Sequence, residues 1–130
     1  MTTTMERILP AMAEIFRKDA EIEEIPITSI EGHAEQGSLS LKVLMTTKDF
    51  VVLKAWRGKG LIDPRHKHDD HESVAMLVKG RMKMKIGDEE FDVGPGDVWR
   101  HPPGVWHESV ALEDCIQIEI KSPPCRTWNL

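Results

Sequence analysis

The sequence predicts an all-β domain, folded as a closed sandwich or barrel, with a short helix before it. Short segments of four to nine residues with strand character follow one another from residue 38 onward. Gly, Pro or Asp separates almost every pair of segments, and several segments alternate apolar and polar residues. Many short strands with tight turns are typical of β-sandwiches and barrels. A length of 130 residues fits one domain, spanning 1–130.

The helix is expected close to the N-terminus. Pro10 can occupy a first helical turn, where its missing N–H costs nothing. Met12, Ile15 and Phe16 then recur at helical spacing. The helix is expected to end by Asp19 and to pack on the outside of the main body.

The strands are expected after this helix. They are predicted at 38–46, 50–56, 72–79, 81–86, 89–93, 98–101, 106–112 and 115–121. Within 81–86 the apolar residues share one face and the basic residues share the other, which predicts a half-buried strand. Within 115–121 the three isoleucines share one face, opposite Cys115, Gln117 and Glu119.

Composition excludes several classes of partner. The chain has 17 Lys and Arg against 22 Asp and Glu, a net charge of −5, so a phosphate-binding basic surface and a nucleic-acid partner are not expected. No run of 18 apolar residues would cross a membrane, and the first residues do not resemble a signal peptide. Cys115 and Cys125 form no disulfide framework, so a cytoplasmic location is expected.

The histidines are clustered. Five of the six fall between residues 66 and 107, and only His33 lies outside: His66, His68, His71, His101 and His107. Such a cluster favours a metal site or an acid–base site over scattered surface histidines.

His66 and His68 are two residues apart, so on a strand both rings point to one face. Glu72 follows beyond a tight turn, which can return its carboxylate beside the two rings. Two histidines and a carboxylate suit a divalent first-row metal. The alternatives are two solvated histidines, and a surface ion pair of Glu72 with Lys79 or Arg81.

His107 opens the strand that follows a Pro-Pro-Gly turn. A closed barrel can bring its ring against the earlier group as a fourth ligand, although a hydrogen-bonded core histidine is the alternative. Together the four positions predict a metal site.

These residues make the chain resemble a small single-domain cupin. Motif 1, at about residues 60–80, contains Gly60, His66, His68, Glu72 and Gly80. Motif 2, at about residues 96–111, contains Gly96, Pro102, Gly104 and His107. The resemblance implies a cupin jelly-roll β-barrel and one divalent transition metal (Zn, Fe, Mn or Ni). By the same resemblance the metal ligands are His66, His68, Glu72 and His107.

The chain departs from the cupin pattern in two places. Ala111 occupies the final Asn position, and seven residues rather than six separate Glu72 from Gly80. Counting back from Gly80 puts Ser73 at the acidic position, and a slip of one residue exchanges the two faces of a strand. A bulge near residues 69–70 would return Glu72 to the inside, whereas without it His71 becomes the better ligand. We predict Glu72 as the ligand, with His71 at the rim as a catalytic proton carrier.

The pocket walls are predicted near the second motif. His101 is a candidate for acid–base catalysis or for supporting a ligand. The candidates for the substrate pocket are Trp99, Trp106, Met84 and Gln117, with ordinary barrel filling as the alternative.

The function expected is that of a metal-dependent enzyme for a small oxygen-rich metabolite. Uronates, diketones and polyketide-like molecules are candidate ligands, and isomerase, lyase or cyclase chemistry is expected. Residues 111–126 resemble the tail of pectin-degradation-type cupins, which act on unsaturated uronates. The alternatives are a non-catalytic binder of a metal or small molecule, an Fe(II) dioxygenase, and a metal-free structural barrel. A homodimer formed through edge strands is expected.

Overall fold

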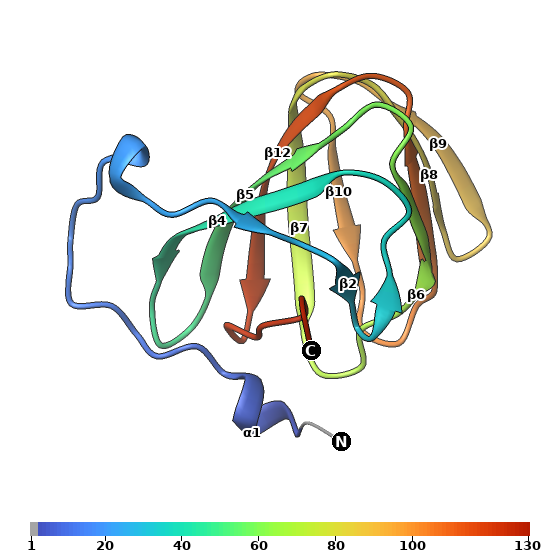
Figure 1. Ribbon diagram of the computed structural model, residues 1–130. Coiled ribbons are helices and arrows are strands. Elements are labelled where there is room, and N and C mark those ends of the chain that lie inside the picture. Colours follow the sequence, from blue (N-terminus) through green and yellow to red (C-terminus); the bar gives the residue numbers. More distant parts are fainter. Residues whose placement is uncertain (1–2) are drawn as a thin grey trace.

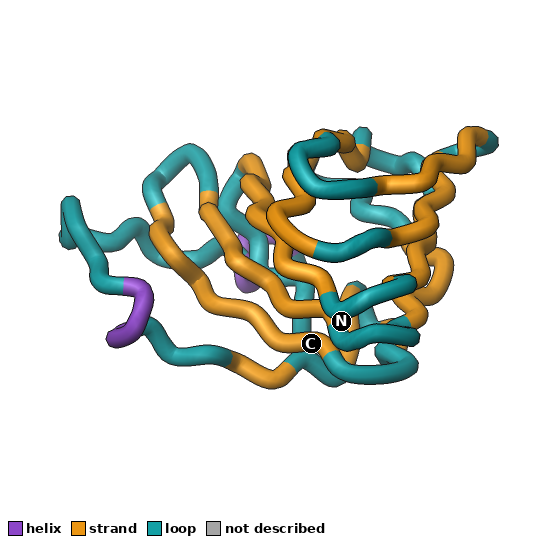
Figure 2. Tube along the Cα trace, turned by 90° about the horizontal axis from the view of Figure 1, so that it is seen from above, coloured by secondary structure: helices purple, strands orange, loops and turns teal. Residues whose placement is uncertain are grey.

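Two antiparallel β-sheets face each other across the interior in the computed structural model, which describes residues 3–130 (Figures 1 and 2). The larger sheet has the strand order β1-β4-β5-β12-β7-β10, and the smaller sheet has the order β6-β11-β8-β9. The larger sheet consists of β1 (Ile25–Pro26), β4 (Leu39–Thr46), β5 (Val51–Arg57), β12 (Cys115–Ser122), β7 (Glu72–Lys79) and β10 (Val98–His101). The smaller sheet consists of β6 (Ile62–His66), β11 (His107–Ala111), β8 (Met82–Ile86) and β9 (Glu89–Val93). This arrangement is the predicted jelly-roll barrel.

The strand pattern of the sequence is confirmed, because period-2 alternation decides which side chains face inward. In β8, Met82 and Met84 are buried while the two lysines between and after them are exposed. The eight predicted segments match strands of the structure to within two residues at each end. Strand β6 and the two-stranded sheet of β2 (Ser29–Ile30) and β3 (His33–Ala34) were not among the predicted segments.

The N-terminal helix is short, as predicted, but it lies elsewhere. It is α1 (Thr4–Arg7), which begins with a capping box between Thr3 and Glu6. The segment from residue 9 to 18 contains no helix and runs beside the barrel in extended form (Figure 1). A single 3₁₀ turn, η1 (Asp19–Glu21), follows it. No helix among residues 3–130 is long and apolar enough to cross a membrane.

Contacts with β4 explain why the predicted helical pattern fails. The backbone N–H of Met12 donates to the carbonyl of Thr46, and the Arg17 guanidinium donates to the carbonyls of Val43 and Leu44. These hydrogen bonds hold the segment along the end of β4, where no surface covers an apolar helix face. Ile15 therefore remains 99% exposed.

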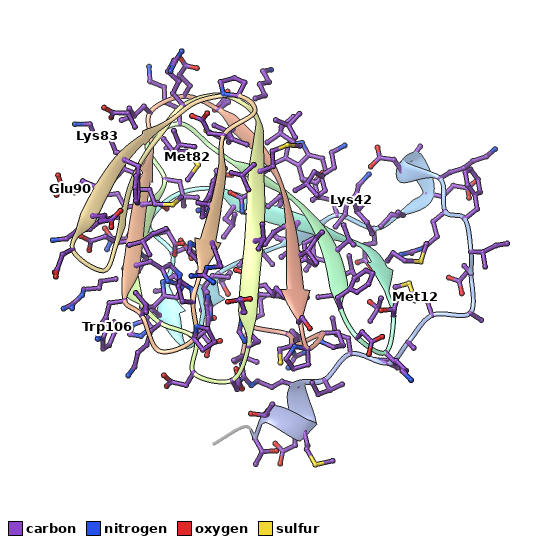
Figure 3. All side chains as sticks on the ribbon, turned by 180° about the vertical axis from the view of Figure 1, so that it is seen from behind. Met12, Lys42, Met82, Lys83, Glu90 and Trp106 are labelled. Carbon is purple, nitrogen blue, oxygen red and sulfur yellow. The ribbon has the colours of Figure 1, made fainter. Side chains whose placement is uncertain are left out.

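The interior of the barrel is divided into an apolar end and a polar end. Leu77, Met82 and Trp99 belong to the apolar core, which Figure 3 shows around the labelled Met82. The opposite end contains the buried histidines together with Glu119 and Lys121. The apolar end closes the barrel, and the polar end is where a functional site can lie.

Strand β12 places its polar face inside the barrel. Gln117, Glu119 and Lys121 are buried, whereas Ile116, Ile118 and Ile120 point to the outer face and are partly or fully exposed. The alternation predicted for this strand is present. Its apolar residues, however, line the outside of the larger sheet.

Gly80, in the turn between β7 and β8, has a backbone that only glycine fits. Its φ is +100°, and a Cβ would lie 2.5 Å from the Asp114 carbonyl oxygen. Gly60 shares the left-handed conformation, with φ +87°, but a Cβ there would meet nothing within 4 Å.

We expect Gly60→Ala to lower the free energy of unfolding by about 1–2 kcal/mol, the usual cost of this backbone conformation. Gly80→Ala should cost about 2 kcal/mol more because of the overlap. Urea denaturation of both variants measures the difference, and equal losses would contradict the steric explanation.

Candidate metal site

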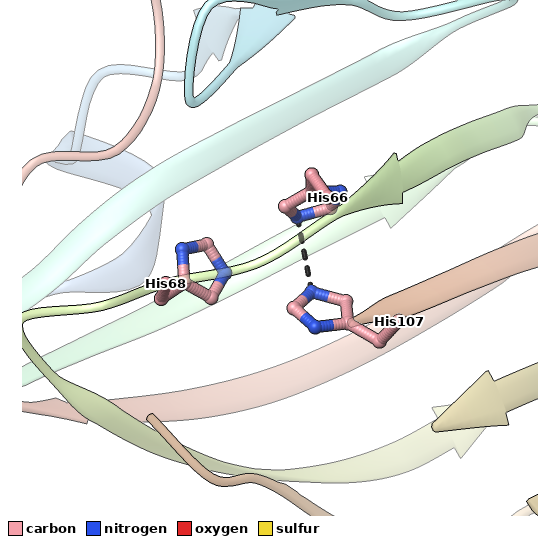
Figure 4. A group of neighbouring side chains, drawn as sticks. All are labelled: His66, His68 and His107. Atoms are coloured by element: carbon pink, nitrogen blue, oxygen red, sulfur yellow. Dashed lines mark hydrogen bonds between the residues drawn. The ribbon is translucent and has the colours of Figure 1, made fainter. Parts of the chain in front are cut away.

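Three histidines meet at the polar end of the barrel (Figure 4). His66 ends β6 and lies directly opposite His107, the first residue of β11, in the antiparallel pairing. His68 follows His66 by two residues and turns its ring to the same side, with the two ring centroids 5.0 Å apart. One ring nitrogen from each residue lies within 4.8 Å of the others. The structure thus brings together His66, His68 and His107, as the sequence predicted.

Each of these rings has an acceptor at its Nδ1 atom. The Nδ1 of His66 lies 2.7 Å from the Pro64 carbonyl oxygen, and that of His107 lies 3.4 Å from the Val105 carbonyl oxygen. The Nδ1 of His68 lies 3.0 Å from a Glu31 carboxylate oxygen. A carbonyl oxygen can only accept, so Nδ1 donates and Nε2 keeps its lone pair. This is the arrangement typical of histidines that bind a metal through Nε2.

The Nε2 atoms of His66 and His107 are only 3.0 Å apart (Figure 4). This contact is a hydrogen bond when one of the two Nε2 atoms carries a proton, and it brings two lone pairs together when both Nδ1 atoms donate. A cation between the rings would take the place of that proton and contact both nitrogens favourably. The donor set of three imidazoles therefore fits a divalent transition metal such as Zn, Fe, Mn or Ni.

Burial keeps the imidazoles of His68 and His107 uncharged. It lowers the pKa of His107 to about 2, with His101 and His66 adding to the effect. Burial and the positive charge of Lys121 also lower the pKa of His68. Metal binding requires neutral imidazole, so these two rings are already in the protonation state that a metal needs.

Glu72 does not join the three histidines, and the placement predicted for it is wrong. Its carboxylate is 45% exposed and lies 3.5 Å from the Arg100 guanidinium on the outside of the sheet. The register of β7 and β10 places Ser73 opposite His101, and Ser73 is the buried residue. No bulge occurs at the start of β7, so strand alternation turns Glu72 outward. The weaker alternative from the sequence, with His71 inside, is the one the structure adopts.

His71 is a buried neighbour of the site and does not lie at its rim. Its side chain is fully buried, its Nδ1 lies 2.9 Å from an Asp70 carboxylate oxygen, and its Nε2 has no partner within the described protein. Burial lowers its pKa to about 4. The ring centroid lies 4.4 Å from that of His68. His71 is thus oriented as a metal-binding histidine would be.

Two further groups of possible ligands overlap at His71. Glu31, His68 and His71 form one group, and Asp70, His71 and Cys125 form the other. Neither group contains His66 or His107. His71 therefore extends the candidate site toward Asp70 and Cys125. It does not belong to the group formed by His66, His68 and His107.

His101 lies against the group of three, as a candidate catalytic residue should. Its ring stacks on that of His107, with centroids 3.7 Å apart and planes 8° apart. Ser73 contacts its Nδ1 at 3.3 Å, and its Nε2 has no partner among residues 3–130. Burial lowers the pKa of His101 to about 3, so the ring is neutral.

A small cavity of about 50 Å³ lies beside the histidines. Four polar residues of the larger sheet line it and form a chain of contacts. The Arg57 Nε donates to Gln117 at 2.8 Å, and Gln117 donates to Glu119 at 3.1 Å. The Lys121 ammonium lies 3.2 Å from the other Glu119 oxygen. Although burial opposes it, the positive charge of Lys121 helps to hold the pKa of Glu119 at about 2.

Of the four predicted pocket residues, only Gln117 lines this cavity. Trp99 and Met84 belong to the apolar core. Trp106 is 40% exposed on the outer face, where Arg65 and Lys67 cover its ring (Figure 3). The barrel-filling alternative was correct for Trp99 and Met84, and Trp106 covers the surface.

The acidic and basic neighbours of the site were not among the sequence candidates. Gln117, Glu119 and Lys121 alternate along β12, and a polar face in a predicted barrel strand is a signal that could have indicated an interior site. Glu31 and Arg7 come from distant segments, and no spacing connects them to the histidines.

Comparisons with known proteins agree with this fold. Residues 53–116 match the cupin domain family. The chain is a small cupin. It is 28% identical over 83 residues to the pectin degradation protein KdgF of Dickeya dadantii (strain 3937), which covers 63% of this chain and 76% of that protein. The solved structure of KdgF from a Halomonas species matches with 27% identity and a TM-score of 0.63, over 65% of this chain and 78% of that one.

A second solved structure matches over more of this cupin. It is an RmlC-like cupin from Shewanella frigidimarina, with 25% identity and a TM-score of 0.74, over 85% of this chain and 92% of that chain. The similarity thus includes the barrel and extends beyond residues 53–116.

The buried histidines make stability depend on pH. The pKa values of His68, His71, His101 and His107 lie well below those in the unfolded chain, near 6.5. Below that pH these histidines therefore bind protons in the unfolded chain but not in the folded chain. Their contribution to stability is complete above about pH 6.5 and is lost as the pH falls. The raised pKa of Glu35, about 9, acts in the opposite direction but offsets only one proton.

We expect the metal-free protein to lose at least about 1.4 kcal/mol of unfolding free energy per pH unit between pH 6 and 5, the equivalent of one net proton. Urea denaturation in the presence of a chelator measures it. The His71→Gln variant should show a shallower pH dependence. A flat profile in the unchanged protein would mean that the rings are accessible to protons.

Proposed function

We propose that this cupin binds one divalent first-row transition metal at His66, His68 and His107 and acts as an enzyme on a small carboxylated, oxygen-rich metabolite of the uronate class. The proposal depends on one observation above all. Three imidazoles bring one ring nitrogen each to the same place, beside a cavity that also holds charged side chains. A metal held by His66, His68 and His107 would polarise a carbonyl or hydroxyl oxygen of the ligand.

The charged side chains of the cavity suit a ligand that carries a carboxylate together with hydroxyl groups. Arg57 and Lys121 can donate to a carboxylate, while Asp63 and Glu119, which pair with them and leave the wall without net charge, can accept from hydroxyl groups. The similarity to proteins named for pectin degradation supports the same class, because pectin is a polymer of uronates. Isomerase or lyase chemistry remains our expectation for this class.

Two groups could move a proton in such a reaction. Glu119 is ionised at neutral pH, because its pKa lies at about 2. His101 is neutral and has a free Nε2, so it can accept a proton there. Both residues line the cavity from the inner face of the larger sheet, Glu119 on β12 and His101 on β10. They are our candidates for acid–base catalysis.

The test uses protein purified without chelator. We expect elemental analysis to find about one metal per chain. A 4,5-unsaturated uronate should be consumed, as followed by proton NMR, while acetylacetone, a neutral diketone, should remain unchanged. His66→Gln and His107→Gln should each lose metal and turnover. Glu72→Gln is the matched control, since its carboxylate faces outward, and it should keep both.

Two results would contradict this proposal. Absence of metal in the purified protein, with no uptake of added Zn, Mn, Fe or Ni, would refute the metal site. Loss of metal in Glu72→Gln would show that the side chain reaches the site after all.

The size of the cavity favours a second candidate, a non-catalytic metal binder. A volume of about 50 Å³ holds only a few water molecules, given the roughly 10–15 Å³ that each requires. A sugar acid fits only if part of the lining, which includes Ile30 and Trp128, moves aside. Metal binding with thermal stabilisation by uronate but no turnover would identify a binder.

We further propose that the protein forms a homodimer through the outer face of the larger sheet. Val74, Met76, Val98, Ile118 and Ile120 are neighbours across β7, β10 and β12 and form an aliphatic patch. Four of them are more than 40% exposed. Monomeric proteins rarely expose such a surface. A second copy is the partner we propose, because an uncharged patch meets its own copy without repulsion.

The dimer is tested by light scattering during gel filtration. The unchanged protein should elute with twice the mass of one chain, and Met76→Glu with Ile120→Lys should elute as a monomer that keeps its metal. Lys83→Glu, on the exposed face of β8, is the control and should leave the dimer intact. A monomer at every concentration of the unchanged protein would refute the proposal.

A further inference from the structure

We propose that Arg7, in the N-terminal segment, is a positioning residue for the metal site, because it clamps the two carboxylates that orient His68 and His71. The inference rests on the proposed metal-binding function and adds to it a control of the site by a segment far from the cupin motifs.

The contacts form two short chains that meet at one guanidinium. One Arg7 nitrogen lies 3.2 Å from the Glu31 carboxylate oxygen that also contacts the Nδ1 of His68 at 3.0 Å. The other nitrogen pairs with the Asp70 carboxylate, whose second oxygen contacts the Nδ1 of His71 at 2.9 Å. Arg7 thus contacts each histidine indirectly, through a single carboxylate between them.

The place of Arg7 is fixed by the backbone around it. Its carbonyl accepts a hydrogen bond from the Arg126 N–H at 2.8 Å, and its guanidinium donates to the Arg126 carbonyl at 3.4 Å. Ile8 and Cys125 form an isolated antiparallel bridge. As a result the Arg7 side chain is only 8% exposed. The cation is therefore a part of the interior and not a mobile surface charge.

The two carboxylates need this cation. Glu31 and Asp70 both contact the Arg7 guanidinium, so their negative charges lie close together. Burial raises the pKa of Glu31, and the charge of Asp70 adds to the effect. Without Arg7 the two anions repel each other, and the lowest-energy response is for one to rotate away or to take up a proton. Either response removes the acceptor that holds the Nδ1 proton of a neighbouring histidine. A planar guanidinium can satisfy both carboxylates at once, which a lysine ammonium does less well.

The contacts of Glu31 with His68 and of Asp70 with His71 follow a general rule for metal-binding histidines. A carboxylate that accepts from Nδ1 fixes the tautomer and the ring orientation, and loss of such a partner typically lowers metal affinity by about 10–100-fold. The carbonyl acceptors of His66 and His107 belong to the main chain and do not depend on Arg7. The effect of Arg7 should therefore appear at His68 and His71 and be absent at the other two rings.

The experiment compares Arg7→Met, Arg7→Lys, Glu31→Gln and Arg17→Met. Arg17 is the matched control, because it is also a cation of the N-terminal segment but donates only to backbone carbonyls of β4 and to neighbouring groups of its own segment. Two measurements are made on each protein. Nitrogen-15 NMR of the histidine rings in metal-free protein shows which nitrogen carries the proton, and competition with a chelator gives the affinity for Zn²⁺ or Co²⁺.

We expect Arg7→Met to lose the fixed Nδ1–H tautomer at His68 and His71 and to bind metal about tenfold more weakly. Arg7→Lys should recover part of both, and Arg17→Met should match the unchanged protein. The double variant Arg7→Met/Glu31→Gln should bind metal no more weakly than Glu31→Gln alone. Unchanged tautomers and affinity within twofold in Arg7→Met would overturn the inference. The inference is also overturned if the tautomers of His66 and His107 change as much as that of His68, because a general loosening of the fold would affect all the rings.

The tautomer measurement needs neither metal nor substrate, so it separates this inference from the proposed function. A protein that binds metal without turnover would refute the enzyme and leave the role of Arg7 intact. If Arg7→Met fails to fold, Glu31→Met and Asp70→Ala replace it, since each removes the oxygen that accepts from a histidine Nδ1–H. They should release His68 and His71, respectively, and release of neither ring would overturn the inference.

Discussion

The need to keep buried imidazole rings neutral and hydrogen-bonded determines how the polar end of this barrel is built. Burial removes the charge from the rings, and each Nδ1–H then needs an acceptor. Main-chain carbonyls serve His66 and His107, whereas His68 and His71 use the carboxylates of Glu31 and Asp70. Those carboxylates are themselves partly buried and require a cation, so the loops and the N-terminal segment are connected to the histidines through successive polar contacts.

The same requirement explains the reversed faces of β12. Glu119 and Lys121 point into the barrel, where each satisfies the other, and the isoleucines between them cover the outside. A barrel whose strands were all apolar inside would be more stable but would have no charged group beside the histidines. The cost of the polar interior is reduced by the pairing of Glu119 with Lys121 and by the Gln117 amide that connects Glu119 to Arg57.

Local sequence patterns predicted much of the fold and most of the histidine site. Strand alternation located eight strands, and the motif spacing indicated His66, His68 and His107, which meet where β6 ends and β11 begins. The inserted residue before Gly80 could not be placed from the sequence, because a bulge and a reversed face are equally compatible with one extra residue. The N-terminal helix was misplaced since its pattern of apolar residues depends on a surface that the barrel does not offer. Glu31 has no motif, and its role is visible only in three dimensions.

The walls of the cavity connect ligand size to the orientation of the histidines. Ile30 and Trp128 line the cavity and form an isolated bridge with each other, and the next N–H, that of Glu31, donates to the Thr127 carbonyl at 2.7 Å. A ligand larger than the cavity that enters on this side would displace this part of the wall. Because Glu31 directly follows Ile30, such a displacement also shifts the acceptor of the His68 Nδ1 proton. The entry of a sugar acid and the geometry of the histidine site are therefore coupled through two adjacent residues, whereas a ligand of only a few atoms leaves both unchanged.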